Sequence, residues 1–228
     1  MITFIKVKNN PHILEFIKQS EKVLKNQGYT DHGLLHGQSV ANRARTIAKE
    51  IGLTKEDQEM AAISGFCHDM GNFLSRSNHN YFGAILFYQV FKDEFLIEKI
   101  SIIMQAISVH DKEEIGDKEE AEMNFSHLIS AILIIADKSD VRKERVCLEN
   151  LTEIKKDIHD RVNYATYWSK LKIDKKRKKI TLFLKIDTKV VPIMEYFEIF
   201  TQRMVYCRKA AKYLGYNFGL VINNFKLL

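Results

Sequence analysis

His68 and Asp69 stand side by side at the end of an expected helix, in the segment GFCHDMG. Neighbouring side chains on a helix point about 100° apart, so an adjacent pair rarely serves one packing face. Thr54 and Asp57 predict a capped start for this helix, and Gly71 predicts its end. A buried histidine beside a helix-end carboxylate explains the pair when it is taken alone, whereas a metal ion at the helix end explains both groups together.

Helical periodicity extends over about the first 150 residues, where apolar side chains recur three and four positions apart. Helices are expected over residues 10–27, over 33–51, up to His68-Asp69, after the polar loop 75–80, over 93–109, and from a cap at Ser126 to Asp137. The charged segment Lys112–Asn124 is expected to be a surface loop. Residues 1–150 are therefore predicted to form a bundle of six or seven helices.

The pattern changes in residues 151–228, which are predicted to form a C-terminal extension packed on the bundle. Alternation of apolar and polar residues predicts a β-hairpin at about 170–187. Pro192 fits the start of a helix that continues to about Leu214. The fold class is thus mainly α, with a small hairpin-and-helix appendage.

The net charge of +6 is accounted for by one segment, because Lys170–Lys179 holds seven basic residues and one Asp. The remaining sequence is balanced, so binding to nucleic acid is not expected. No apolar stretch approaches the ~20 residues that span a bilayer, and no signal peptide is evident, so no membrane association is expected. Three scattered cysteines predict no disulfide framework. These features predict a cytoplasmic protein, and an oligomer remains open.

Histidines and aspartates recur at the ends of the expected helices. They are His36, His68, Asp69, His79, His110 and Asp137. Buried metal sites in helical bundles are usually built from ligands on several helices. Imidazoles and carboxylates without thiolates suit a first-row transition metal better than calcium or a structural zinc. The recurrence favours a metal site over a set of unrelated caps and core histidines.

The order His36, His68-Asp69, Asp137 resembles the H…HD…D motif of the HD-domain metal-dependent phosphohydrolases. The resemblance covers about residues 30–146 and implies an HD-type helical domain. Members of that superfamily that bind two metals carry extra histidines, to which His79 and His110 are similar. The resemblance therefore implies two divalent transition-metal ions, with Fe, Mn, Zn, Ni and Co not distinguished and Mg also admitted.

The same resemblance suggests roles for other residues. Asp69 is expected to contact both ions and to orient the nucleophile. His32 and His36 also resemble the H-x3-H of cyclic-nucleotide phosphodiesterases, where the first histidine is a general acid. Many relatives carry a lysine three positions after the Asp, and Asn72 stands there instead. The candidates for holding the substrate phosphate are Lys138 (also a candidate catalytic residue), Arg142, Arg145 and Asn72; a solvated basic helix face is the alternative for the three cations.

The function expected from these residues is metal-dependent hydrolysis of a phosphate ester or anhydride of a small molecule, most simply a nucleotide. A non-catalytic sensor that binds metal and nucleotide is the alternative that Asn72 favours. An iron-dependent oxygenase built on the same ligands is a third.

Overall fold

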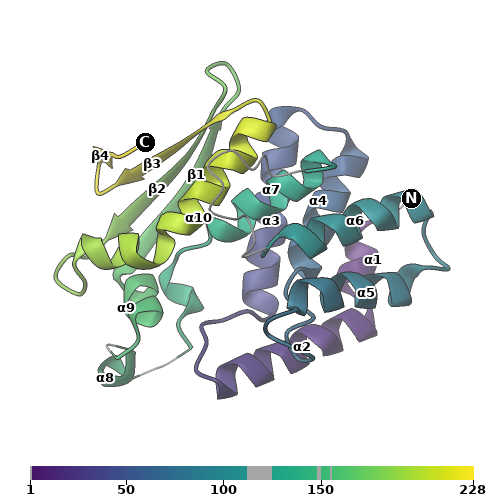
Figure 1. Cartoon of the computed structure of the whole chain (residues 1–228), viewed down its shortest axis with the longest axis horizontal. Coiled ribbons are helices and arrows are strands. Elements are labelled where there is room, and N and C mark those ends of the chain that lie inside the picture. The colour runs from purple at the N-terminus through teal and green to yellow at the C-terminus, as the bar shows by residue number, and fades with distance from the viewer. Residues whose placement is uncertain (1, 112–124, 148–149, 155) are drawn as a thin grey trace.

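The computed structural model describes residues 2–111, 125–147, 150–154 and 156–228. The described helices are α1 (Phe4–Lys8), α2 (Pro11–Asn26), α3 (Leu34–Ile51), α4 (Lys55–Cys67), α5 (His79–Phe91), α6 (Ile97–Val109), α7 (Leu128–Lys138), α8 (Leu151–Ile154), α9 (Ile158–Ala165) and α10 (Ile193–Tyr213), with a short 3-10 turn, η1 (Lys143–Arg145). The strands are β1 (Thr166–Asp174), β2 (Lys179–Ile186), β3 (Asn217–Ile222) and β4 (Phe225–Lys226). The predicted mainly α class is confirmed, with the sheet and α10 on one side of the bundle (Figure 1).

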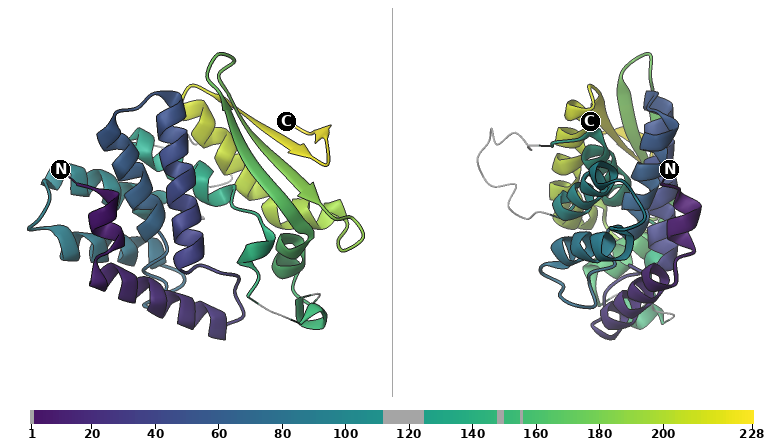
Figure 2. Two further views of the ribbon diagram at one scale, coloured as in Figure 1. Left: turned by 180° about the vertical axis from the view of Figure 1, so that it is seen from behind. Right: turned by 90° about the vertical axis from the view of Figure 1, so that its right-hand side faces the viewer.

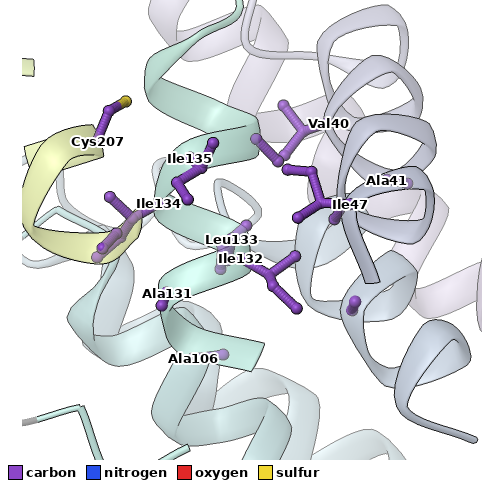
Figure 3. Packing of buried hydrophobic residues seen from close by; sticks show 14 of the residues in the cluster. Val40, Ala41, Ile47, Ala106, Ala131, Ile132, Leu133, Ile134, Ile135 and Cys207 are labelled. Atoms are coloured by element: carbon purple, nitrogen blue, oxygen red, sulfur yellow. The ribbon is translucent and has the colours of Figure 1, made fainter. Parts of the chain in front are cut away.

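α7 is the central helix of the molecule. It packs against α3, α4 and α6 on the bundle side and against α10 of the C-terminal part. Figure 3 shows its apolar side chains between these neighbours, with Ile132 toward α3 and Ile134 toward Cys207 of α10. The residues from Ile129 to Lys138 are all buried. A helix that is apolar on every side is usually buried. The polar residues at the end of α7, Asp137 and Lys138, therefore lie in the interior of the protein.

Some of the helix starts and caps predicted from the sequence are confirmed and others are not. Thr54 and Asp57 form the predicted capping box of α4, with reciprocal side-chain and backbone hydrogen bonds. The predicted cap of α7 at Ser126 is wrong, because the ring of His127 accepts the N–H of Ile129 and caps the helix instead. α6 begins at Ile97, later than predicted. The predicted surface loop 112–124 lies outside the described residues.

Gly71 is required for close packing rather than for a left-handed helix end. A Cβ at this position would lie 2.1 Å from the carbonyl oxygen of His79 and 2.5 Å from the N–H nitrogen of Gly83. The glycines with positive φ in the described chain lie elsewhere, at residues 28, 52 and 215. The lack of a side chain lets the turn after His68-Asp69 lie directly on the start of α5.

The C-terminal part contains the predicted hairpin and helix and two more strands. β1 and β2 are antiparallel, β2 pairs in parallel with β3 across α10, and β4 folds back on β3. Figure 2 shows α10 along one face of this sheet. No helix among the described residues is long and apolar enough to cross a membrane.

Candidate metal centre

Four buried imidazoles converge at one end of the bundle, each with its Nδ1 already engaged. The Nδ1 atoms of His68, His79 and His110 lie 2.8, 2.7 and 2.6 Å from the carbonyl oxygens of residues 65, 76 and 107. The Nδ1 of His36 lies 2.8 Å from a carboxylate oxygen of Asp140. An Nδ1–H that donates to these oxygens leaves Nε2 as a bare lone pair, the form in which histidine binds a metal.

These Nε2 atoms face one another in two pairs. They lie 3.3 Å apart in His36 and His68, and 3.2 Å apart in His79 and His110. Two lone pairs at this distance repel unless a proton or a cation lies between them. Ligands that each bind one ion at about 2.1 Å are about 3.0–3.4 Å apart for bond angles between about 90° and 110°. The imidazole pairs therefore fit the spacing of two divalent-metal sites.

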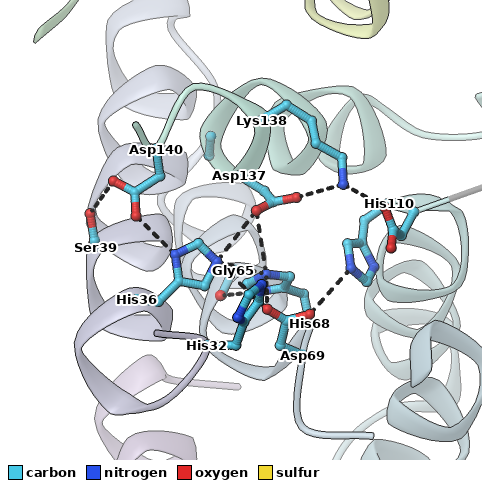
Figure 4. Close-up of polar contacts among 12 residues, drawn as sticks. His32, His36, Ser39, Gly65, His68, Asp69, His110, Asp137, Lys138 and Asp140 are labelled. Atoms are coloured by element: carbon cyan, nitrogen blue, oxygen red, sulfur yellow. Dashed lines mark hydrogen bonds and ion pairs between the residues drawn. The ribbon is translucent and has the colours of Figure 1, made fainter. Parts of the chain in front are cut away.

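Asp69 lies between the two imidazole pairs. Its Oδ2 is 3.1 Å from Nε2 of His68 and 3.6 Å from Nε2 of His36. Its Oδ1 is 3.3 Å from Nε2 of His79 and 3.8 Å from Nε2 of His110. One oxygen thus faces each pair, which is the arrangement of a carboxylate that bridges two ions. Figure 4 shows Asp69 between His68 and His110.

Each imidazole pair also has a second carboxylate nearby, in addition to Asp69. Asp137, at the end of α7, places Oδ1 3.4 Å from Nε2 of His36. Asp111, directly after His110, places Oδ2 3.6 Å from Nε2 of His79. The ligand atoms of His36, His68 and Asp137 lie within 4.8 Å of one another, as do those of His79, His110 and Asp111. Asp111 was not among the ligands predicted from sequence, although its position next to His110 repeats the His-Asp pairing of residues 68 and 69.

The buried imidazoles and carboxylates of the cluster shift each other's pKa values in opposite directions. Burial lowers the pKa of His68, but Asp69 and Asp137 outweigh burial and raise it to about 10. Burial also raises the pKa of Asp69, whereas the imidazoles around it hold that pKa well below its usual range. The carboxylates thus favour a positive charge among the imidazoles, which a proton or a bound metal ion can supply.

Two aspartates outside the ligand set position His36. Asp31 accepts the backbone N–H of His36 at 3.0 Å and that of Gly33 at 2.8 Å, and so holds the start of α3. Asp140 is fully buried, accepts hydrogen bonds from the ring of His36 and from Arg142, and forms an ion pair with Arg43 at 3.4 Å. A carboxylate on the far nitrogen of a ligating histidine fixes the tautomer and raises the basicity of the ring.

We expect Asp140→Asn to weaken metal binding roughly 10- to 100-fold, since the amide cannot supply the charge that orients His36. The dissociation constant is measured by competition with a chelator. Asp160→Asn is the control, because Asp160 is a buried carboxylate on α9 that does not line the pocket. Equal metal affinity in Asp140→Asn and the parent protein would contradict the orienting role.

A small pocket opens onto the cluster. Nine of the described residues line it: His32, Asp69, Arg76, His110, Asp111, Asp137, Lys138, Arg145 and Arg203. All nine are ionisable, and four are permanently cationic. The pocket is therefore suited to an anion approaching the imidazole and carboxylate cluster.

The residues predicted to bind the substrate phosphate differ in whether they line the pocket and in the partners that hold them. Lys138 lies in the pocket lining and pairs with Asp111 at 2.7 Å and Asp137 at 3.0 Å. Arg145 also lines the pocket, but its guanidinium donates to the carbonyl oxygens of residues 31 and 140. Asn72 donates to Asp69 Oδ1 at 3.1 Å and accepts from Arg76 at 2.9 Å.

The basic helix face proposed for Lys138, Arg142 and Arg145 is wrong, because α7 ends at Lys138 and the chain then turns at Ser139 before η1. Arg142 pairs with Asp140 at 2.8 Å and is not part of the described pocket lining. His32 lines the pocket, and its Nδ1 contacts the carbonyl oxygen of Thr30. Burial holds the pKa of His32 well below its ordinary value.

The family model of the HD domain matches residues 34–143, from the first residue of α3 to just beyond α7. No curated protein matches the chain. The matched segment contains all six metal ligands predicted from sequence, whereas His32, Arg145 and Arg203 lie outside it.

Proposed function

The chain carries an HD domain over residues 34–143, and on that premise we propose that it is a metal-dependent hydrolase of phosphate esters or anhydrides of a small molecule. HD domains are generally metal-dependent phosphohydrolases. The observation that carries the proposal is the double cluster in which Asp69 faces two imidazole pairs whose Nε2 atoms lie 3.2 and 3.3 Å apart. An entirely ionisable pocket beside that cluster supports a phosphorylated substrate.

The residues that would hold the ions form two groups around Asp69. They are His36, His68 and Asp137 in one group, and His79, His110 and Asp111 in the other. Bound divalent cations would polarise a phosphoryl oxygen and lower the pKa of water toward neutrality. The donor set does not separate Fe, Mn, Zn, Ni or Co, because imidazole and carboxylate ligands suit several of these ions.

The remaining roles belong to the side chains themselves. Asp69 accepts a hydrogen bond from the attacking water and orients it in line with the phosphorus. The cations Lys138 and Arg76 offset the charge that develops on the phosphoryl oxygens. His32 donates to the carbonyl of Thr30 through Nδ1, so its Nε2 is left for the leaving oxygen. Burial holds the pKa of His32 well below its ordinary value, and the negative charge of a bound phosphate would oppose that shift.

A nucleotide is the substrate class we propose. The described lining of the pocket is almost wholly polar and offers little apolar surface to a base, so we place the phosphate in the pocket and the nucleoside at its mouth. The exposed ring of Tyr29 packs against Arg76, with the guanidinium 5.4 Å from the ring centroid. An exposed aromatic ring beside a phosphate pocket is suited to stacking a base.

Hydrolysis of a panel of phosphorylated metabolites by the metal-loaded protein tests this function. The panel contains nucleoside mono-, di- and triphosphates, cyclic nucleotides and sugar phosphates, each with Mn²⁺, Fe²⁺, Ni²⁺, Co²⁺, Zn²⁺ or Mg²⁺. Release of inorganic phosphate or pyrophosphate is the expected result. Tight nucleotide binding without turnover under any metal would instead identify a sensor. Oxygen consumption by the iron(II)-loaded protein would identify an oxygenase.

Neutralising the basic hairpin tip is expected to leave hydrolysis within a few-fold of the parent. The variant changes Lys175, Lys176, Arg177, Lys178 and Lys179 to Gln. None of these residues is among those found to line the pocket, and changes at exposed turns usually alter stability by less than about 0.5 kcal/mol. Steady-state kinetics on the best substrate is the measurement. A collapse of kcat in a folded variant would show that the tip acts on the site.

A further inference from the structure

Arg203 is a cation in the pocket that comes from outside the matched HD segment. It lies on α10 in the C-terminal part, and its side chain lines the pocket together with Asp69 and His110. Among the described residues it makes no hydrogen bond or ion pair, and its guanidinium rests 4.9 Å from the ring centroid of Phe200. A half-buried guanidinium has lost part of its hydration without gaining an anionic partner.

The other cations of the pocket already have partners. Lys138 is held by two carboxylates, Arg145 donates to two backbone carbonyls, and Arg76 donates to the side chain of Asn72. Within the described part of the chain, Arg203 therefore keeps its guanidinium donors for a ligand. Burial lowers the pKa of Arg203, but an arginine stays charged at neutral pH.

The packing of α10 on α7 explains how the guanidinium reaches the cluster. Cys207 of α10 is buried and lies near Ile134 of α7 (Figure 3). Arg203 is one turn before Cys207 on the same face of α10, and Asp137 is one turn beyond Ile134 on α7. Since α10 and α7 pack against each other, this register brings Arg203 to the end of α7 that carries Asp137 and Lys138.

We propose that Arg203 binds the phosphoryl oxygens of the substrate, so that the C-terminal extension completes the phosphate site of the HD domain. The assignment rests on the proposed function for its substrate class. A planar guanidinium matches two phosphate oxygens at once, and each charge-assisted hydrogen bond is stronger than a neutral one. Its position outside the ligand groups makes Arg203 a binding residue for the substrate and not for the metal.

The test measures binding of inorganic phosphate to the metal-loaded full chain by calorimetry. Arg203→Met removes the charge and keeps much of the side-chain volume, and we expect the phosphate dissociation constant to rise about 10- to 100-fold. Arg203→Lys keeps the charge without the fork and is expected to recover part of the affinity. Arg208→Met is the matched control, because Arg208 is an exposed arginine on the same helix. Metal content and the thermal midpoint should be the same in all four proteins.

Phosphate affinity within twofold of the parent in folded Arg203→Met would overturn the assignment, as would a parent that binds no phosphate. If Arg203→Met fails to fold, Arg203→Lys decides the question, and parental affinity in that variant together with parental KM would overturn the bidentate role. A parent that binds phosphate through Arg203 but hydrolyses no substrate would leave the assignment intact and refute the proposed hydrolase. Hydrolysis with an unchanged KM in Arg203→Met would refute the assignment of Arg203 and leave the proposed hydrolase intact.

Discussion

Asp69→Asn is expected to lose its bound divalent metal and its hydrolytic activity together, while keeping the helical circular dichroism of the parent. The two oxygens of Asp69 lie 3.1 Å from Nε2 of His68 and 3.3 Å from Nε2 of His79, so one substitution removes a ligand from both groups. The amide keeps the volume of the side chain but not its charge. Loss of metal-ion polarisation, which contributes several kcal/mol, corresponds to a fall in activity of about 10³-fold or more.

Elemental analysis and steady-state kinetics of the purified variant check this expectation. Asp93→Asn provides the control, because Asp93 is an exposed carboxylate that lies outside the pocket lining. It should keep the metal content and the activity of the parent. If Asp69→Asn retained the full metal content of the parent, the assignment of Asp69 as a ligand would be wrong.

The second large effect is expected in the number of ions. The parent should bind about two divalent ions per chain, and the double variant His79→Ala/His110→Ala about one. These two imidazoles form the second pair, with Nε2 atoms 3.2 Å apart, while His36, His68 and Asp137 remain to hold the first ion. Two ions that share a carboxylate stand about 3.5–4 Å apart, the spacing that clamps the attacking and leaving oxygens of a phosphoryl group.

Metal stoichiometry after dialysis measures the effect, and magnetic coupling in the Mn²⁺-loaded parent measures the closeness of the ions. His12→Ala/His159→Ala is the matched control, because both histidines are exposed and neither lines the pocket. It should bind as many ions as the parent. A single ion in both the parent and the His79/His110 variant would describe a mononuclear site, with these two histidines left to substrate contact or structure.

Local signals were enough to predict the helical part of this chain. The spacing of apolar residues predicted α3, α4 and α7 closely, and the Thr54 and Asp57 capping box was visible in the sequence. The predicted hairpin corresponds to β1 and β2: side chains of β2 alternate between buried and half-buried, and those in the middle of β1 alternate between half-buried and exposed. Such features depend on residues within one or two turns of each other, so they can be read without knowing what the element packs against. The short elements α1, α8 and α9 carried too little pattern to be predicted.

The types and order of the six ligand candidates were also readable, because His and Asp at successive helix ends are unusual in a core. The structure brings His36, His68, Asp69, His79, His110 and Asp137 into one cluster. Their roles as ligands stay a prediction until metal is measured.

Only the tertiary structure could decide the partners that come from distant segments. β3 is almost wholly buried and shows no alternation, and it joins the sheet in parallel with β2 across the whole of α10. Asp140 reaches the ring of His36, which is 104 residues away, and Arg203 reaches the pocket because α10 packs on α7. The sequence by itself determined which helices form and which of their ends carry imidazole and carboxylate, because both are local properties. Which cations and carboxylates surround those ends was decided by the packing of helices far apart in the chain, since no local pattern encodes a contact between them.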